Sequence, residues 1–258
     1  MIISHVRIAV SGITALAAMG VYAIVLLFPS RWVFFIMAPL WCVIFSLLVR
    51  RLARFSGDRK TSVGLAVVTT IALFSLVSIV EWPPLLWFSV LLSGVISFFL
   101  VSISLGEQSG AVHEFKELRR IHAMILTFDL GAIMTTLYAI GIFFPQVPFL
   151  LLSAIGGAFF SVASFLVWRL YHDIHIRSHA LWILVFFFMM SESIWVMHLL
   201  PFSYEISGVL TTWLWYVAQL LARFHFSSQG ILWKNQYVFL LTNILAYTAT
   251  VVFFVRWV

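Results

Sequence analysis

The chain has 258 residues, of which 63% are hydrophobic and 9% are charged, and it carries a formal net charge of +6. A water-soluble globular domain has about 45–50% apolar and about 25% charged residues, so this composition excludes that class. Cys42 is the single cysteine, which excludes disulfides within the chain, CxxC redox chemistry and Cys-rich zinc sites. The composition therefore predicts an integral membrane protein.

Nine apolar segments follow one another along the chain, each close to the length of about 20 residues that a membrane-spanning helix needs. The first continues past Ala15-Leu16-Ala17, which could imitate a signal-peptide cleavage site, so we expect an uncleaved first span. Residues 106–120 have apolar residues at helical spacing and are predicted to extend the fifth span as an amphipathic lead-in. The nine segments are 8–28, 32–49, 63–80, 85–105, 121–144, 149–168, 180–200, 206–222 and 236–255.

Two kinds of connection alternate between these segments. Very short connections that contain proline lie at 28–31, 81–84, 144–148 and 200–204. The connections between them are longer and rich in Lys and Arg. Since short connections join neighbouring antiparallel helices, the sequence predicts an all-α, polytopic transmembrane helical bundle. We expect residues 1–258 to form a single transmembrane domain of four helical hairpins and a ninth helix.

The distribution of basic residues predicts the orientation. All Lys and Arg residues except Arg31 and Arg256 fall on the same side as the N-terminus. Because Lys and Arg in short loops are retained in the cytoplasm, we expect the N-terminus inside and the C-terminus outside a bacterial inner or plasma membrane. The positive charge then meets anionic lipid headgroups, and nothing remains to support a nucleic-acid partner.

Two predicted helices carry small residues at the same offsets from the preceding proline. The spacing i, i+4, i+8 puts each set on one helix face, which lets helices approach closely in lipid. An internal duplication of two hairpins would explain the match, and so would the general recurrence of small-residue stripes in membrane bundles. The two sets are Ser89, Ser93 and Ser97, and Ser153, Gly157 and Ser161.

Ionisable residues within membrane spans are costly and are therefore functional candidates. Two carboxyl groups qualify, those of Asp129 and Glu192, and no span contains a Lys or Arg that could neutralise them. Burial favours the protonated form of such a carboxyl group. If Gln219 and Asn243 face them, the four residues would line a polar cavity open to the cytoplasm, as in transporters and proton relays. The alternative is hydrogen bonding between helices, worth about 1 kcal/mol per pair.

A group of histidines forms a second candidate site. His172, His175 and His179 would share one helix face if the sixth helix continues into the cytoplasm, and imidazoles at this spacing can ligate zinc. The alternative is that these side chains contact water and headgroups at the membrane surface. A haem held by His122 and His179 is a further alternative. Because no motif identifies a cofactor, the sequence predicts none.

The C-terminal half carries a series of short motifs, SESIW at 191–195, LPF at 200–202, WLWY at 213–216 and VRW at 255–257. In these motifs, and in its alternating basic loops and proline turns, the chain resembles a group of uncharacterised polytopic membrane proteins from candidate-phylum bacteria. The resemblance implies the same multi-span fold. It implies no activity, because none is known for that group.

Three functions remain open. The first is a non-catalytic assembly or interaction protein, since the spans are mostly apolar and no catalytic constellation is present. The second is a small-solute or proton-coupled transporter that uses Asp129 and Glu192. The third is an enzyme that modifies a lipid at the inner face with the histidine and carboxylate residues there. The sequence favours the first function, and therefore a protein that is not an enzyme.

Overall fold

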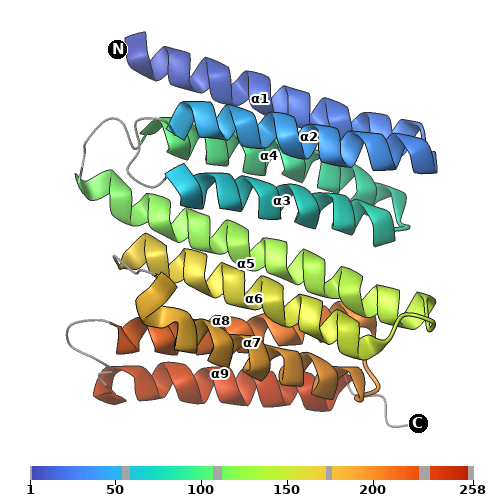
Figure 1. The fold of residues 1–258 in the computed structure, drawn as a ribbon, viewed down its shortest axis with the longest axis vertical. Coiled ribbons are helices and arrows are strands. Elements are labelled where there is room, and N and C mark those ends of the chain that lie inside the picture. Colours follow the sequence, from blue (N-terminus) through green and yellow to red (C-terminus); the bar gives the residue numbers. More distant parts are fainter. Residues whose placement is uncertain (1, 54–58, 107–111, 173–175, 227–232, 255–258) are drawn as a thin grey trace. The chain divides into compact units, whose positions relative to one another are not determined.

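A computed structural model of the chain describes residues 2–53, 59–106, 112–172, 176–226 and 233–254. Within these ranges the chain forms nine α-helices and no strand (Figure 1). Each helix contains most of one predicted apolar segment, so the predicted all-α fold is confirmed. The helices are α1 (Ile2–Leu27), α2 (Arg31–Leu52), α3 (Arg59–Ile79), α4 (Pro83–Gly106), α5 (Val112–Phe143), α6 (Phe149–Tyr171), α7 (Ile176–His198), α8 (Tyr204–His225) and α9 (Trp233–Phe254).

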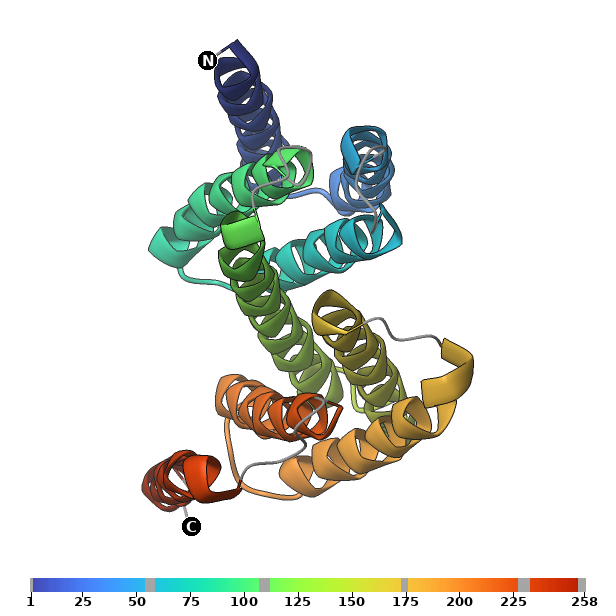
Figure 2. The same ribbon diagram turned by 90° about the vertical axis from the view of Figure 1, so that its left-hand side faces the viewer.

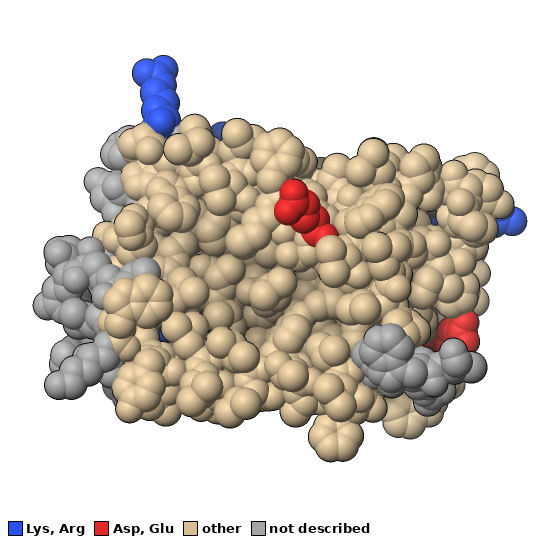
Figure 3. Space-filling model, turned by 90° about the horizontal axis from the view of Figure 1, so that it is seen from below, with Lys and Arg blue, Asp and Glu red and all other residues tan. Residues whose placement is uncertain are grey.

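Eight of the nine described helices are long and apolar enough to cross a membrane, which makes the chain a multi-pass membrane protein. The exception is α8, which corresponds to the expected span 206–222. Its 22 residues are sufficient in length, but Glu205, Gln219 and several Ser and Thr residues make it the more polar helix. The molecular face in Figure 3 is built almost wholly of residues other than Lys, Arg, Asp and Glu, as a lipid-facing surface requires.

Proline marks the predicted hairpin turns. α4 begins at Pro83, and Pro148 is the residue that directly precedes α6. Proline fits the first turn of a helix because its missing N–H would have no partner there. The gaps between α1 and α2, α3 and α4, α5 and α6, and α7 and α8 all fall at the predicted short connections. α5 also extends back to Val112, so the predicted lead-in is helical from that residue onward.

The chain divides into two compact units, Met1–Asp129 and Leu130–Val258, and α5 contributes to both. In unit 1, α1 packs most closely against α4, and α2 packs most closely against α3. In unit 2, α6 packs most closely against α7, and α8 contacts α6, α7 and α9. Figure 2 views the helices more nearly end-on and shows α6 beside α7. The closest helix pairs are therefore not those joined by proline turns.

Small residues explain the close contact between α1 and α4. Ser89, Ser93 and Ser97 of α4 are all buried. A Cβ atom added to Gly94 would lie 2.6 Å from Cγ of Met19 and 3.4 Å from the carbonyl oxygen of Ala15. The serines of the predicted α4 stripe are thus buried, and Gly94, next to Ser93, lies against α1.

Candidate functional site

The second predicted stripe, on α6, packs against α7. Ser153, Gly157 and Ser161 are all buried. A Cβ atom on Gly157 would overlap the Ser191 hydroxyl and would lie 2.8 Å from the carbonyl oxygen of Phe187. This contact turns Ser191 toward α6. Because successive helical residues are rotated by about 100°, it turns the next residue, Glu192, away from α6.

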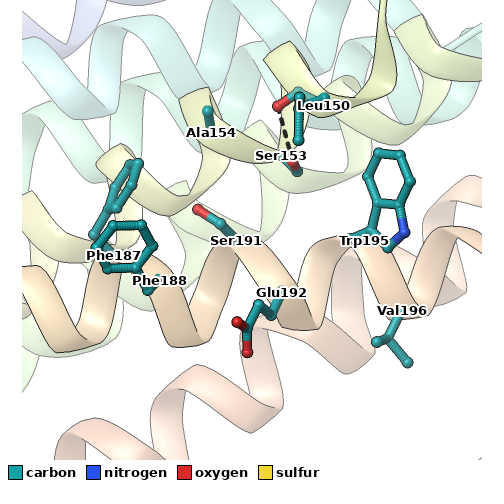
Figure 4. A pocket seen from close by; sticks show the side chains of 9 residues that line it. All are labelled: Leu150, Ser153, Ala154, Phe187, Phe188, Ser191, Glu192, Trp195 and Val196. Carbon is teal, nitrogen blue, oxygen red and sulfur yellow. Dashed lines mark hydrogen bonds between the residues drawn. The ribbon is translucent and has the colours of Figure 1, made fainter.

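An open groove of about 530 Å³ lies along α6 and α7 beside this contact. Glu192 is exposed there and is the one ionisable residue in the lining. Figure 4 shows its carboxylate on the opposite side of α7 from the Ser191 hydroxyl. The lining residues are Leu150, Ser153, Ala154, Phe187, Phe188, Ser191, Glu192, Trp195 and Val196.

Glu192 lies within the apolar part of α7. The candidate span is Arg177–His198, and a rise of about 1.5 Å per residue places Glu192 about 9 Å before the end of that span. No hydrogen bond or ion pair joins its carboxylate to another of the described residues. A carboxylate at this depth is costly unless it is protonated or paired. An unsatisfied acidic group therefore lies at the edge of the groove, inside the apolar span.

Aromatic rings fix one end of the groove. Phe149, at the start of α6, stacks on the His198 ring with 3.6 Å between centroids. The centroid of the Phe149 ring also lies 6.0 Å from that of the Trp195 ring. Since these contacts tie the start of α6 to the end of α7, the groove is formed without any bound partner.

Asp129 is the second intramembrane carboxyl group, and it belongs to a different environment. Its side chain is 0% exposed in unit 1. The Thr69 hydroxyl donates a hydrogen bond of 2.6 Å to Asp129 Oδ2, while Oδ1 has no hydrogen-bond partner among the described residues. The hydroxyl of Tyr22, which is also fully buried, lies within electrostatic reach of this carboxyl group and has no such partner either.

Gln219 and Asn243 lie in unit 2 with Glu192, but no hydrogen bond among the described residues joins these three. Asn243 accepts a hydrogen bond of 2.9 Å from Trp213 Nε1 and donates one of 2.8 Å to the Phe239 carbonyl. Gln219 is buried, and its Oε1 has no partner among the described residues. Asn243 therefore has the structural role of joining α9 to α8. A convergence of all four polar residues stays a prediction.

The polar contacts of α8 were not predicted from the sequence. The Tyr138 hydroxyl of α5 lies 2.8 Å from Thr211 Oγ1 and donates to the Ile194 carbonyl at 3.2 Å. Trp215 Nε1 donates a hydrogen bond of 2.7 Å to Ser164 Oγ of α6. These bonds explain how a comparatively polar helix is accommodated, because its polar side chains are directed into unit 2. The sequence feature that could have predicted these contacts is the series of Ser, Thr and Trp residues at helical spacing along 207–219.

The α5–α8 contact was likewise missed. A Cβ atom on Gly208 would overlap Thr135 Oγ1 and would lie 2.7 Å from the Thr135 backbone nitrogen. Gly208 thus permits the backbones of the two helices to approach closely, which places the Tyr138 hydroxyl within reach of α7 and α8.

The predicted histidine group is only partly described. His172 caps the end of α6, and the His179 ring lies 5.2 Å from the ring of Phe226. His175 lies outside the described residues, so the three-histidine site stays a prediction. Within the described ranges, no three or more His, Cys, Asp or Glu side chains form a group that could hold a metal ion.

Comparison with known proteins adds no assignment to these sites. No protein-family model, no curated protein and no solved structure matches the chain. The function must therefore be argued from the two carboxyl groups and the surfaces that carry them.

Proposed function

We propose that the chain is a non-catalytic assembly protein of the bacterial inner membrane, which binds a transmembrane helix of another protein in the α6–α7 groove. The observation that supports this proposal is the exposed Glu192 carboxylate at the edge of an otherwise apolar groove. Such a group is expensive next to lipid tails. It becomes favourable when a partner helix covers the groove and supplies a hydrogen-bond donor or a positive charge.

Charge complementarity specifies the chemistry of the partner. The partner helix carries a Lys or Arg residue that meets Glu192 near the outer part of the span. None of the described spans of this chain has a Lys or Arg in its interior, so the positive charge comes from a different protein. Phe187, Phe188 and Trp195 supply the apolar surface that surrounds the pair.

Site-specific photocrosslinking in native membranes tests this proposal. A photoreactive amino acid in place of Val196, which is exposed in the groove, should crosslink to a transmembrane peptide of another protein. Mass spectrometry of the crosslinked peptide should find a Lys or Arg within its apolar stretch. Glu192→Gln should reduce the crosslink yield at least about tenfold, the effect of losing about 1.4 kcal/mol of binding free energy.

Glu205→Gln is the matched control, because it removes an exposed carboxylate at the start of α8, away from the groove lining. This variant should leave the crosslink yield unchanged. Crosslinks to lipid alone, to a second copy of the chain or to residues 2–129 of the same chain would contradict the proposed partner.

The proposal includes an orientation in the membrane. The N-terminus lies in the cytoplasm and the C-terminus lies outside, with α8 as a ninth span. The basic connections then contact the anionic lipid headgroups of the inner leaflet, which attract Lys and Arg near the membrane surface. The asymmetric placement of Lys and Arg in the sequence supports this orientation.

Proton-coupled transport is the second candidate function, and the burial of Asp129 near the middle of its span favours it. Carboxyl groups at this depth serve as coupling sites in transporters. Because Asp129 is fully buried, transport requires a second conformation in which water reaches it. Vesicles that contain the purified protein and a trapped pH dye should then acidify under an imposed potential, and Asp129→Asn should abolish the proton flux. Equal proton flux through the wild-type protein and the Asp129→Asn variant would contradict transport through Asp129.

A further inference from the structure

A buried polar cluster in unit 1 carries an inference that is independent of the α6–α7 groove. Its members come from three helices: Tyr22 from α1, Thr69 from α3 and Asp129 from α5. Each of the three side chains is 1% exposed or less. Polar groups are costly to bury unless hydrogen bonds satisfy them, so the state of these three groups determines how well unit 1 packs.

A single hydrogen bond is formed within the cluster. Thr69 Oγ1 donates to Asp129 Oδ2 at 2.6 Å. Neither Asp129 Oδ1 nor the Tyr22 hydroxyl has a hydrogen-bond partner among the described residues. The interactions of the Asp129 carboxyl with described residues are those with Thr69 and Tyr22, and neither supplies a positive charge. An ionised carboxylate would therefore be buried without a counter-charge, which is strongly unfavourable.

The hydrogen bond from Thr69 distinguishes the two carboxyl oxygens. Oδ2 accepts this bond and so acts as the carbonyl oxygen, which leaves Oδ1 to carry a proton. The buried Tyr22 hydroxyl acts on this carboxyl group through electrostatics and forms no hydrogen bond with it. Protonation of Asp129 thus removes a buried charge that has no counter-charge among the described residues.

We infer that Asp129 and Thr69 form a proton-binding site beside Tyr22, in which the Asp129 carboxyl group accepts the Thr69 hydrogen bond on Oδ2 and holds a proton on Oδ1. The spans of α3 and α4 contain no titratable residue. Cys42 of α2 lies close enough to act on Tyr22. His122 lies two helical turns from Asp129 on α5, at about 10 Å along the axis.

The position of the site couples proton binding to helix packing. Asp129 lies close to the middle of the span Arg119–Phe143, and Thr69 lies close to the middle of the span Thr61–Ile79. Loss of the proton would leave a charge that must be hydrated, and water can reach it only if α1, α3 and α5 separate. Proton binding therefore favours the closed packing of unit 1, and proton release favours an open one.

Infrared spectroscopy of the full chain in lipid vesicles at neutral pH tests this inference. The wild-type minus Asp129→Asn difference spectrum should contain the C=O stretching band of a protonated carboxylic acid, and D2O should shift that band. Thr69→Val should move the band to higher frequency, because the C=O group loses its hydrogen-bond donor. Tyr247→Phe, which changes a tyrosine of unit 2, should leave the band unchanged.

Isotope labelling keeps the test independent of the folding of the Asp129→Asn variant. The aspartates of the chain are Asp58, Asp129 and Asp173, and of these Asp129 alone lies within a span. ¹³C-labelled aspartate should therefore shift the same band in the wild-type protein. Glu192→Gln should leave it unchanged, which separates this site from the proposed docking groove. Absence of a labelled acid band at neutral pH, or a band unaffected by Thr69→Val, would overturn the inference.

Discussion

Glu192 and Asp129 are both intramembrane carboxyl groups, yet their surroundings give them different chemistry. Glu192 is exposed in an apolar groove and has no partner among the described residues. Asp129 is fully buried and accepts a hydrogen bond from Thr69. An exposed carboxylate in lipid needs a partner from outside the chain, whereas we infer that the buried one binds a proton and keeps the hydrogen bond from Thr69.

Gly157 is a position where a single methyl group should be costly. A Cβ atom there would meet both the Ser191 hydroxyl and the backbone carbonyl of Phe187. Ser191 can rotate away, but the carbonyl group can move only if α6 and α7 separate. We expect Gly157→Ala to lower the free energy of unfolding by about 1–3 kcal/mol, the usual cost of overpacking.

Thermal unfolding in lipid nanodiscs measures this effect, and Gly20→Ala is the matched control. A Cβ atom on Gly20 meets no atom within 4 Å, so that variant should be as stable as the wild type or slightly more stable. Equal stability of the Gly157→Ala and Gly20→Ala variants would show that the α6–α7 contact is looser than described.

The Tyr138 hydroxyl should stabilise the junction of α5, α7 and α8. It lies 2.8 Å from Thr211 Oγ1 and 3.2 Å from the Ile194 carbonyl oxygen. A double-mutant cycle with Tyr138→Phe and Thr211→Val should give a coupling free energy of about 0.6–1.7 kcal/mol, the range for hydrogen bonds within membranes. Tyr247→Phe is the control, because its hydroxyl has only a 3.9 Å contact with Met197 Sδ.

At the residue scale, the sequence could identify the polar positions but not their partners. Gln219 and Asn243 are possible partners of Asp129 from the sequence, and its described hydrogen-bond partner is Thr69 of α3. Asn243 was a candidate for the same cavity, and it bonds to Trp213. A charged residue within an apolar segment can be recognised from the sequence alone. Which side chain contacts it depends on how each helix is rotated about its axis, and an apolar sequence does not predict that rotation well.

At the element scale, α8 is the helix whose place in the membrane depends most on packing. Its composition sets it apart from the eight apolar helices, yet its polar side chains Ser207, Thr211 and Gln219 are buried in unit 2. We expect it to cross the membrane because these groups are covered by neighbouring helices rather than exposed to lipid.

Cysteine accessibility can test this crossing in a Cys42→Ala background. Ser203→Cys and His225→Cys place thiols at the two exposed ends of α8. An impermeant maleimide should label the first variant in intact cells and the second only after permeabilisation. Labelling of both variants from the same side would show that α8 does not cross.

The helix ends were the elements best predicted from the sequence, because prolines and basic residues interrupt the apolar runs. The helix pairs were not predicted. The proline turns suggested contacts within each hairpin, whereas α1 packs most closely against α4. Small residues such as Gly94 favour that pairing because they allow the backbones to approach. The sequence shows that such a residue permits a close contact, but it does not show which helix makes the contact.

At the scale of the whole molecule, the proposal that α8 is a ninth span places the two termini on opposite faces of the membrane. A reporter enzyme that is active only outside the cytoplasm should be active when fused after Val258 and inactive when fused before Met1. The clustering of Lys and Arg on one side is the physical reason, since these residues resist translocation. Activity of both fusions, or of the N-terminal fusion alone, would contradict this orientation.

We propose that another membrane protein covers the surface that carries Glu192. Cryo-electron microscopy of the chain purified from its native membrane can observe this partner. We expect a foreign transmembrane helix over the α6–α7 groove, with a Lys or Arg nitrogen within about 4 Å of the Glu192 carboxylate, the range of an ion pair. A groove filled by lipid acyl chains, or covered by residues of the same chain, would contradict it.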